Sequence, residues 1–317
     1  MDDAQRKAQI KTTFDTVAEG YGSAGMEFFH KAAAQLPRVF ALQGHEQLLD
    51  VATGTGIAAT ALAPHLPQGR VTGIDLSDGM LAQARARVQA LGLGNVELHA
   101  MDMQAIGFDD ARFDAANCSF GLFFLPDMRS LLQHIASKVK PGGQVLACSF
   151  SQGSFEPNVD LFLERIQRYG VAPPEFTWKN ICTEEQFRSL YASAGLSDVE
   201  TQRHDIGYPM NDAEVWWRVI WYAGFRGLVA QLDETQLAEF KQEHLAEISA
   251  LRTGKLDIHH SLKPEYWANL RDTAKGIKID FVEGIGGDML FLNCTKPPFN
   301  NVDVRRAMMI ATDQKAF

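Results

Sequence analysis

Apolar residues follow two patterns along this chain, one typical of buried strands and one typical of helices. Five short apolar runs predict strands, at 46–53, 70–77, 95–102, 113–120 and 144–150. Three segments between them carry apolar residues at helical spacing, at 57–66, 78–91 and 128–139. This alternation predicts βαβ units with right-handed crossovers. We therefore expect an α/β fold with a doubly wound, mostly parallel sheet, whose functional residues come just after the strands.

Helices are also expected on both sides of this core. Residues 1–45 show helical spacing before and after a glycine-containing break at 20–25. Beyond residue 150 the pattern predicts a sixth strand at 196–206 and four helices, at 154–170, 183–195, 211–232 and 233–251. The chain then divides into a domain at 1–251 and an extension of different character at 252–317. Within the domain we distinguish a helical segment (1–45), a central core (46–150) and a helical cap with the sixth strand (151–251).

Composition narrows the class of protein. The formal net charge is -9 and no long Lys/Arg cluster occurs, which disfavours a nucleic-acid partner. Four cysteines lie far apart, without the spacing of a zinc site or a disulfide framework. The first residues lack the apolar stretch of a secretory signal, and no run approaches the roughly 18 apolar residues of a membrane span. We therefore expect a cytoplasmic protein with no metal, no membrane span and no nucleic-acid partner.

A glycine-rich turn follows the first predicted strand. The sequence LLDVATGTG, residues 48–56, carries Asp50 near the strand end and turns through Gly54 and Gly56 into a helix. Glycine lets the backbone turn tightly and approach a ligand where a Cβ would clash, and the helix start offers unpaired N–H groups. Asp50 is placed to hold the cationic amino group of a methionine moiety, directly or through water.

Carboxylates also close the next two strands. Asp75 is placed to accept hydrogen bonds from both hydroxyls of a ribose, as acidic residues do in dinucleotide sites. Asp102 is placed to accept from the exocyclic amine of an adenine, and Met103 to pack on its ring. After the fourth strand, residues 117–120 line the floor of the same crevice.

With these motifs the chain resembles the class I S-adenosylmethionine-dependent methyltransferases, in particular their ubiquinone/menaquinone C-methyltransferase-like branch. The resemblance spans about residues 8–250 and includes FDTVAEGY, LLDVATGTG, GIDLSDGML, AMDMQAI, FDAANCSFGLFFLPD and VKPGGQV. It implies a Rossmann-like sheet of seven strands, with 46–150 as the cofactor-binding core, and S-adenosyl-L-methionine as cofactor. The implied cofactor contacts are Tyr21, Asp50, Ala52, Thr53, Gly54, Gly56, Asp75, Leu76, Met80, Asp102, Met103, Cys118 and Ser119. Ala52 departs from the family, which usually has glycine there.

Two other functions stay open at this point. Residues 54–59 also fit the pattern G-x-G-x-x-A of an NAD(P)-binding oxidoreductase. Two features argue against an oxidoreductase. Asp50 stands where a dinucleotide site normally has an apolar strand, and residues 1–45 precede the first strand, whereas many NAD domains begin with it. The second alternative is a catalytically silent, cofactor-binding fusion protein.

The expected reaction is methyl transfer by direct displacement, which needs alignment and a dry site more than a strong base. The catalytic residue is therefore unassigned, with Tyr21, His30, His134 and His204 as candidates that are equally compatible with ordinary hydrogen-bonded roles. Aromatic residues after the fourth strand and in 211–232 predict a pocket for a small, apolar or aromatic acceptor, formed by Phe120, Phe123, Phe124, Trp217 and Trp221. Core packing is the alternative role for the same side chains.

The extension at 252–317 resembles an internal fragment of the periplasmic peptide-binding proteins, the family 5 solute-binding proteins. The matching run includes KPPF at 296–299, VRRA at 304–307 and ATD at 311–313. We expect a fusion in which 277–283 supplies the last strand of the sheet and 302–312 forms a helix, because an uncovered sheet edge is unfavourable. A homodimer formed through the extension is the alternative.

Overall fold

The computed structural model describes residues 3–23 and 25–253 of the 317. The chain divides into two compact units, which are described separately. Among the described residues, the first comprises 3–23, 25–154, 174–210 and 218–230, and the second 155–173, 211–217 and 231–253. The predicted strand at 277–283, the helix at 302–312 and the dimer contact lie outside the described residues and stay predictions.

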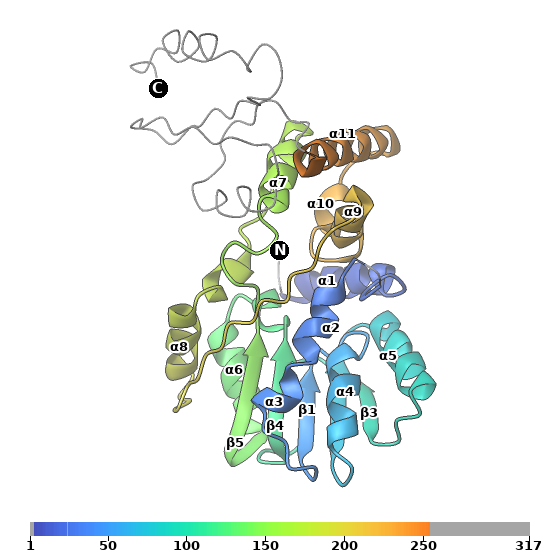
Figure 1. Cartoon of the computed structure of the whole chain (residues 1–317). Helices are drawn as coiled ribbons and strands as arrows, with labels where there is room; N and C mark the ends of the chain where they lie inside the picture. The colour runs from blue at the N-terminus through green and yellow to red at the C-terminus, as the bar shows by residue number, and fades with distance from the viewer. Residues whose placement is uncertain (1–2, 24, 254–317) are drawn as a thin grey trace. The chain divides into compact units, whose positions relative to one another are not determined.

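The first unit is built on a five-stranded parallel sheet in the order β3-β2-β1-β4-β5 (Figure 1). The strands are β1 (Gln47–Val51), β2 (Arg70–Asp75), β3 (Val96–Ala100), β4 (Phe113–Ser119) and β5 (Val139–Cys148). The strand order reverses between β1 and β4, and parallel sheets of this kind bind ligands outside the carboxyl ends of the strands at such a point. The α/β fold, the five core strands and their parallel pairing are confirmed.

The prediction of seven strands is not met within the described residues, which form five. Residues 201–210, which include most of the predicted sixth strand, have no regular secondary structure. Polar and charged side chains dominate this segment, with Gln202, Arg203, His204 and Asp205 in succession. Such a stretch has no apolar face to bury against a sheet, so tertiary packing does not favour a strand here.

Helices of the first unit surround the sheet. They are α1 (Asp3–Val17), α2 (Glu27–Ala33), α3 (Leu36–Val39), α4 (Ile57–Leu62), α5 (Asp78–Ala90), α6 (Met128–Ser137), α8 (Glu184–Ser193) and α10 (Arg226–Val229), with 3-10 turns η1 (Ala63–His65), η2 (Leu122–Phe124) and η3 (Thr177–Ile181). Side chains fix where several of them begin. Ser77 caps α5, Asp127 caps α6, and Thr183 with Gln186 forms a capping box on α8.

The core of the first unit lies on the central strands. Leu48, Leu49 and Val51 of β1 and Ile74 of β2 are fully buried. Strands buried on both faces read as continuous apolar runs, which is why the sequence pattern identifies them.

The second unit contains α7 (Asn158–Arg168) and α11 (Glu234–Thr253), and α9 (Ala213–Tyr222) begins in it. Phe162 of α7 packs edge-on against Phe240 of α11, and both are fully buried. The predicted helix at 211–232 is interrupted after Tyr222, since α10 begins only at Arg226. Among the described residues, no helix has both the length and the apolar character needed to cross a bilayer.

Candidate active site

A cavity of the first unit opens where the strands end. Its polar lining residues follow the strands in spatial order, with Asp102 after β3, Asp75 at the end of β2, Asp50 within β1 and Ser119 at the end of β4. Because the strand order is β3-β2-β1-β4, these groups form a row along one edge of the sheet. An elongated ligand with several polar groups suits such a row.

Asp50 is a fully buried carboxylate in this row. Its Oδ2 accepts a 2.5 Å hydrogen bond from Thr53 Oγ1, and its Oδ1 accepts a 2.6 Å bond from Asn117 Nδ2. Burial raises the pKa of Asp50 to about 6, although the two hydrogen bonds favour the charged form. A cationic group of a ligand would stabilise the carboxylate that burial penalises.

The glycine-rich turn brings backbone close to this carboxylate. Gly54 and Gly56 have left-handed backbone angles, with φ of +56° and +75°. A Cβ at Gly56 would lie 3.1 Å from the Cβ of Ala84 in α5, whereas a Cβ at Gly54 would meet nothing within 4 Å. Gly56 is therefore required by packing, and Gly54 leaves room beside the cavity that it lines. Ala52 also has a positive φ, of 54°, which is uncommon for a residue with a side chain.

Asp75 joins the glycine-rich turn to the start of α5. Its Oδ2 accepts from Gly54 N at 2.8 Å, and its Oδ1 accepts from Ser77 N at 2.9 Å. Burial raises the pKa of Asp75, although these hydrogen bonds favour the charged form and lower it. A carboxylate has about four lone-pair sites, so Asp75 can also accept from a ligand hydroxyl.

Asp102 is paired with the N-terminal helix. Lys7 Nζ of α1 lies 2.7 Å from Asp102 Oδ2, and Gln104 N donates to Oδ1 at 2.8 Å. Met101 and Met103 flank it in the lining of the cavity, so a flat ring bound beside Asp102 would have apolar side chains to contact.

Thr55 provides a further test of what this cavity fits. Its hydroxyl is buried, lines the cavity and has no hydrogen-bonding partner among the described residues. A buried polar atom without a partner is costly. Together with the penalised charge of Asp50 and the open space at Gly54, it fits a ligand that carries both a cation and hydrogen-bonding groups.

Aromatic side chains form another part of the cavity wall. Phe14 of α1 meets Phe124 of η2 edge-on at 5.1 Å between ring centroids, and Phe29 of α2 meets Phe120 at 5.3 Å. Tyr21 stacks on Phe29 at 5.0 Å. Phe120 has a φ of +57°, a strained conformation for a bulky residue that is often found at functional sites.

Most residues predicted for the site line the cavity. They are Tyr21, Asp50, Ala52, Thr53, Gly54, Asp75, Leu76, Met80, Asp102, Met103, Ser119, Phe120 and Phe124. Gly56 does not line it but holds the turn against α5. This placement agrees with the prediction without showing that any of these residues binds a ligand.

Other predicted residues lie elsewhere. Cys118 and Phe123 are buried in the hydrophobic core of the first unit. Trp217 belongs to the second unit, where its ring packs against Phe240 and Lys241. Trp221 holds the Arg226 guanidinium over its ring at 3.8 Å. The cofactor contact of Cys118 and the acceptor-pocket role of the other three stay predictions, with core packing as the alternative role of the three aromatic side chains.

None of the histidines in the described part of the chain lines the cavity. His30 is exposed, and its Nε2 lies 3.0 Å from the carbonyl oxygen of Gly22. His134 accepts from Ile106 N, and His204 contacts Gln202. Each of them makes an ordinary hydrogen bond, which is the role we gave as the alternative to catalysis.

The sequence did not reveal several residues of the cavity wall, among them a group from the two N-terminal helices. They include Lys7, Ile10, Phe14, Phe29, Ala32 and Ala33, together with Met101 and Gln104 after β3. Ile10 and Phe14 recur at helical spacing, which marks an apolar face but does not tell whether it covers a core or a cavity. Lys7 stands in a polar stretch without a distinguishing pattern.

Two family models match the chain. A methyltransferase domain matches residues 48–143, which contain β1 without Gln47, all of β2, β3 and β4, and the first half of β5. The middle part of the bacterial extracellular solute-binding proteins of family 5 matches residues 214–317. The second match begins within α9, well before residue 252, where the extension was predicted to start.

Curated relatives of the chain are methyltransferases. Aklanonic acid methyltransferase DauC of Streptomyces sp. (strain C5) is 32% identical over 178 residues, which cover 56% of this chain and 76% of that protein. Demethylmenaquinone methyltransferase of Bacillus cereus (strain B4264) is 30% identical over 193 residues, which cover 56% of this chain and 81% of that protein. A solved structure from Bacillus halodurans C-125, described as a methyltransferase, has a TM-score of 0.50 at 23% identity and covers 82% of this chain and 93% of its own. This last likeness concerns the fold.

Proposed function

We propose that this chain, which belongs to the S-adenosylmethionine-dependent methyltransferase family, methylates a small apolar or aromatic acceptor by direct displacement. Membership of the family assigns S-adenosylmethionine as the cofactor. It also makes the alternative of an NAD(P)-binding oxidoreductase wrong. The acceptor and the displacement are the parts that we propose.

The residues of the row along the sheet edge fit the cofactor. Asp102 and Asp75 would hold its adenine and ribose, and Asp50 with Thr55 would hold the polar groups of its methionine end. When bound, the cofactor supplies a methyl group on a sulfonium, which is electrophilic. What the protein must add is an acceptor held in line and protected from water.

The aromatic wall carries the proposal for the acceptor. In the strand order β4 comes after β1, so Phe120 and Phe124 follow Asp50 in the row, next to where we propose that the methionine end binds. Phe14 and Phe29 face them with edge-on ring contacts. These rings would exclude water from an apolar or aromatic acceptor and would orient it.

The ionisable groups of the cavity favour an acceptor that needs no strong base. Asp50, Asp75 and Asp102 each accept at least two hydrogen bonds or ion pairs from the protein. Burial raises the pKa of Tyr21 well above its ordinary value, so its hydroxyl stays neutral. A carboxylate, or a phenol or enol acidic enough to be an anion at neutral pH, brings its own electron pair, whereas a protonated alkyl amine would have to lose a proton first.

The names of the two relatives agree with this class. One is named for aklanonic acid and the other for demethylmenaquinone, so their names point to an acid and a quinone. Such names suggest where to begin an acceptor screen for this chain.

The test is methyl transfer by the full chain from S-adenosylmethionine with a labelled methyl group. The panel contains a naphthoquinol, a substituted phenol, an aryl carboxylate and a primary alkyl amine, and mass spectrometry locates the methyl group. We expect transfer to the aromatic acids at neutral pH and little transfer to the amine. Transfer confined to amines or to macromolecules would contradict the proposal, and intact cofactor binding without any transfer would favour the silent fusion protein.

A further inference from the structure

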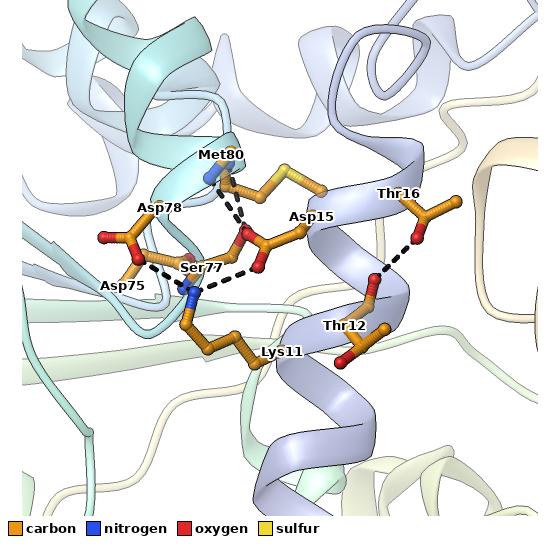
Figure 2. Close-up of polar contacts among 9 residues, drawn as sticks. Lys11, Thr12, Asp15, Thr16, Asp75, Ser77, Asp78 and Met80 are labelled. Carbon is orange, nitrogen blue, oxygen red and sulfur yellow. Dashed lines mark hydrogen bonds and ion pairs between the residues drawn. The ribbon is translucent and has the colours of Figure 1, made fainter.

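A polar cluster fastens α1 to the turn between β2 and α5. Asp15 Oδ1 accepts hydrogen bonds from Ser77 Oγ at 2.6 Å and from Gly79 N at 2.9 Å. Lys11 Nζ lies 2.9 Å from both Asp15 Oδ2 and Asp78 Oδ2. Figure 2 shows Lys11 and Asp15 pointing from α1 toward the turn that carries Ser77 and Asp78.

This cluster reaches the cofactor site through Ser77. The Ser77 hydroxyl donates to Asp15 and accepts from Met80 N at 3.0 Å, as the N-cap of α5. The Ser77 amide donates to Asp75, and Asp75 in turn accepts from Gly54 N. One residue, Ser77, therefore separates the Asp15 carboxylate of α1 from the carboxylate that faces the cavity.

The same helix is fastened a second time, after β3. Lys7 pairs with Asp102 at 2.7 Å. Lys7, Lys11 and Asp15 are spaced four residues apart and so share one face of α1. Ile10 and Phe14, on the neighbouring positions, line the cavity. The polar face of α1 thus contacts both loops of the nucleoside site while its apolar side covers the space between them.

Few apolar residues of α1 are fully buried. Of its 15 residues, all of which the structure describes, Val17 is the one that is fully buried. It packs with Ala18 and Met80, and the half-buried Phe14 packs against the same cluster and against Phe124. Because this apolar contact is limited, the polar contacts of α1 contribute to its docking beside the ring contacts of Phe14.

We propose that Asp15 is a positioning residue for the nucleoside end of the cofactor, which couples the docking of α1 over the cavity to the orientation of Asp75. The carboxylate of Asp15 fixes the Ser77 hydroxyl, and the Ser77 amide fixes Asp75. When α1 leaves, Ser77 loses its acceptor and Asp75 loses a constraint, so an open helix and a disordered ribose site occur together. This inference rests on the cofactor site and is independent of the acceptor.

The experiment compares binding to full-length variants by calorimetry, with S-adenosylhomocysteine and 5′-methylthioadenosine as probes. Asp15→Ala removes the acceptor of two hydrogen bonds and should weaken both probes about tenfold. Asp15→Asn keeps an acceptor oxygen for Ser77 and Gly79 and should bind nearly as the wild type does. Asp78→Ala is the matched control, because the Asp78 carboxylate pairs with Lys11 in the same cluster, whereas the acceptor of the Ser77 hydroxyl is Asp15.

A second readout separates positioning from simple capping of α5. Hydrogen exchange should show that S-adenosylhomocysteine protects the amides of α1 in the wild type and much less in Asp15→Ala. If Asp15→Ala does not fold, Asp15→Glu, which keeps the charge but displaces the carboxylate, should weaken both probes. Wild-type affinity in Asp15→Ala, or equal losses in Asp15→Ala and Asp78→Ala, would overturn the proposal even if its melting temperature falls. Since no acceptor is present, these outcomes leave the acceptor proposal untouched.

Discussion

The side-chain amide of Asn117 lies 2.6 Å from Asp50 Oδ1, so that a residue of β4 holds a carboxylate of β1 across the sheet. The parallel register pairs these two positions directly. Thr53 holds the other carboxylate oxygen. The donors in contact with this buried charge are neutral, which is why burial dominates and the pKa of Asp50 rises to about 6. Two predictions follow from this pair.

Cofactor affinity should rise as the pH increases through the pKa of Asp50. A ligand ammonium pairs with the carboxylate and not with the carboxylic acid, so binding of S-adenosylhomocysteine should weaken up to about tenfold per pH unit below about pH 6. Calorimetry between about pH 5 and about pH 8 measures this dependence. Asp50→Asn should bind weakly with a flatter profile. A wild-type affinity that does not change with pH would show that Asp50 does not face the ammonium.

The same buried charge should lower stability at neutral pH. The folded-state pKa of about 6 lies above the ordinary 3.8, so the favourable protonated form is present at low pH and is lost as the pH rises through about 6. The difference of roughly two units corresponds to about 3 kcal/mol. Asp50→Asn keeps both hydrogen bonds, because the Thr53 hydroxyl can also accept. Its unfolding free energy should exceed that of the wild type by about 1–3 kcal/mol at pH 7 and by little near pH 4. A variant less stable than the wild type at both pH values would contradict the assignment.

The glycines of the turn should separate ligand binding from stability. In Gly56→Ala the new Cβ would lie 3.1 Å from Ala84 and the residue would keep a left-handed φ, so we expect a loss of roughly 2 kcal/mol in stability. In Gly54→Ala the new Cβ would meet no atom within 4 Å, so the loss in stability should be about 1 kcal/mol and should come from the positive φ alone. Because Gly54 lines the cavity, this variant should nevertheless bind S-adenosylhomocysteine less tightly. Thermal unfolding and calorimetry on both variants check this, and an equal effect of the two substitutions on stability would count against it.

The core of the fold was predictable from the sequence because its strands are buried on both faces. Leu48, Leu49 and Val51 form an apolar run, and Asp50 interrupts it at a buried position where burial penalises a charge. A carboxylate at such a position indicates a ligand site more clearly than a surface carboxylate does. The same reasoning finds Asp75, which is half-buried at the end of the apolar strand β2.

The walls of the cavity were not predictable in the same way. Helical spacing identifies Phe14 as part of an apolar face, but only the tertiary structure brings it against Phe124. Trp217 and Trp221 lie on one helix that is aromatic on most sides, and such a helix buries different faces against different neighbours. Here Trp217 packs within the second unit, so core packing is the alternative role of its aromatic ring.

Two neighbouring phenylalanines should distinguish the acceptor wall from the core. Phe124 lines the cavity, whereas Phe123 is buried in the hydrophobic core. Phe124→Leu should raise the KM for an aromatic acceptor several-fold, by loss of a ring contact of about 1 kcal/mol, and leave S-adenosylhomocysteine binding unchanged. Phe123→Leu should instead lower the melting temperature and leave that KM unchanged. If both substitutions affected the KM alike, the boundary between wall and core would be misplaced.

In the second unit a buried histidine should oppose the pH effect of Asp50. His244 is fully buried, and its Nε2 accepts a 2.8 Å hydrogen bond from Trp216 Nε1, which leaves the proton on Nδ1, 3.6 Å from Glu247 Oε2. Burial lowers the pKa of His244, although Glu247 raises it. The unfolded chain therefore binds the proton more tightly, and stability should fall as the pH drops below about 6.5. His244→Gln keeps an acceptor for Trp216 without a titrating group, so its unfolding free energy should decline less between about pH 8 and about pH 5, as measured by tryptophan fluorescence. Equal declines in the variant and the wild type would mean that His244 takes up its proton in the folded unit, with Glu247 as its partner.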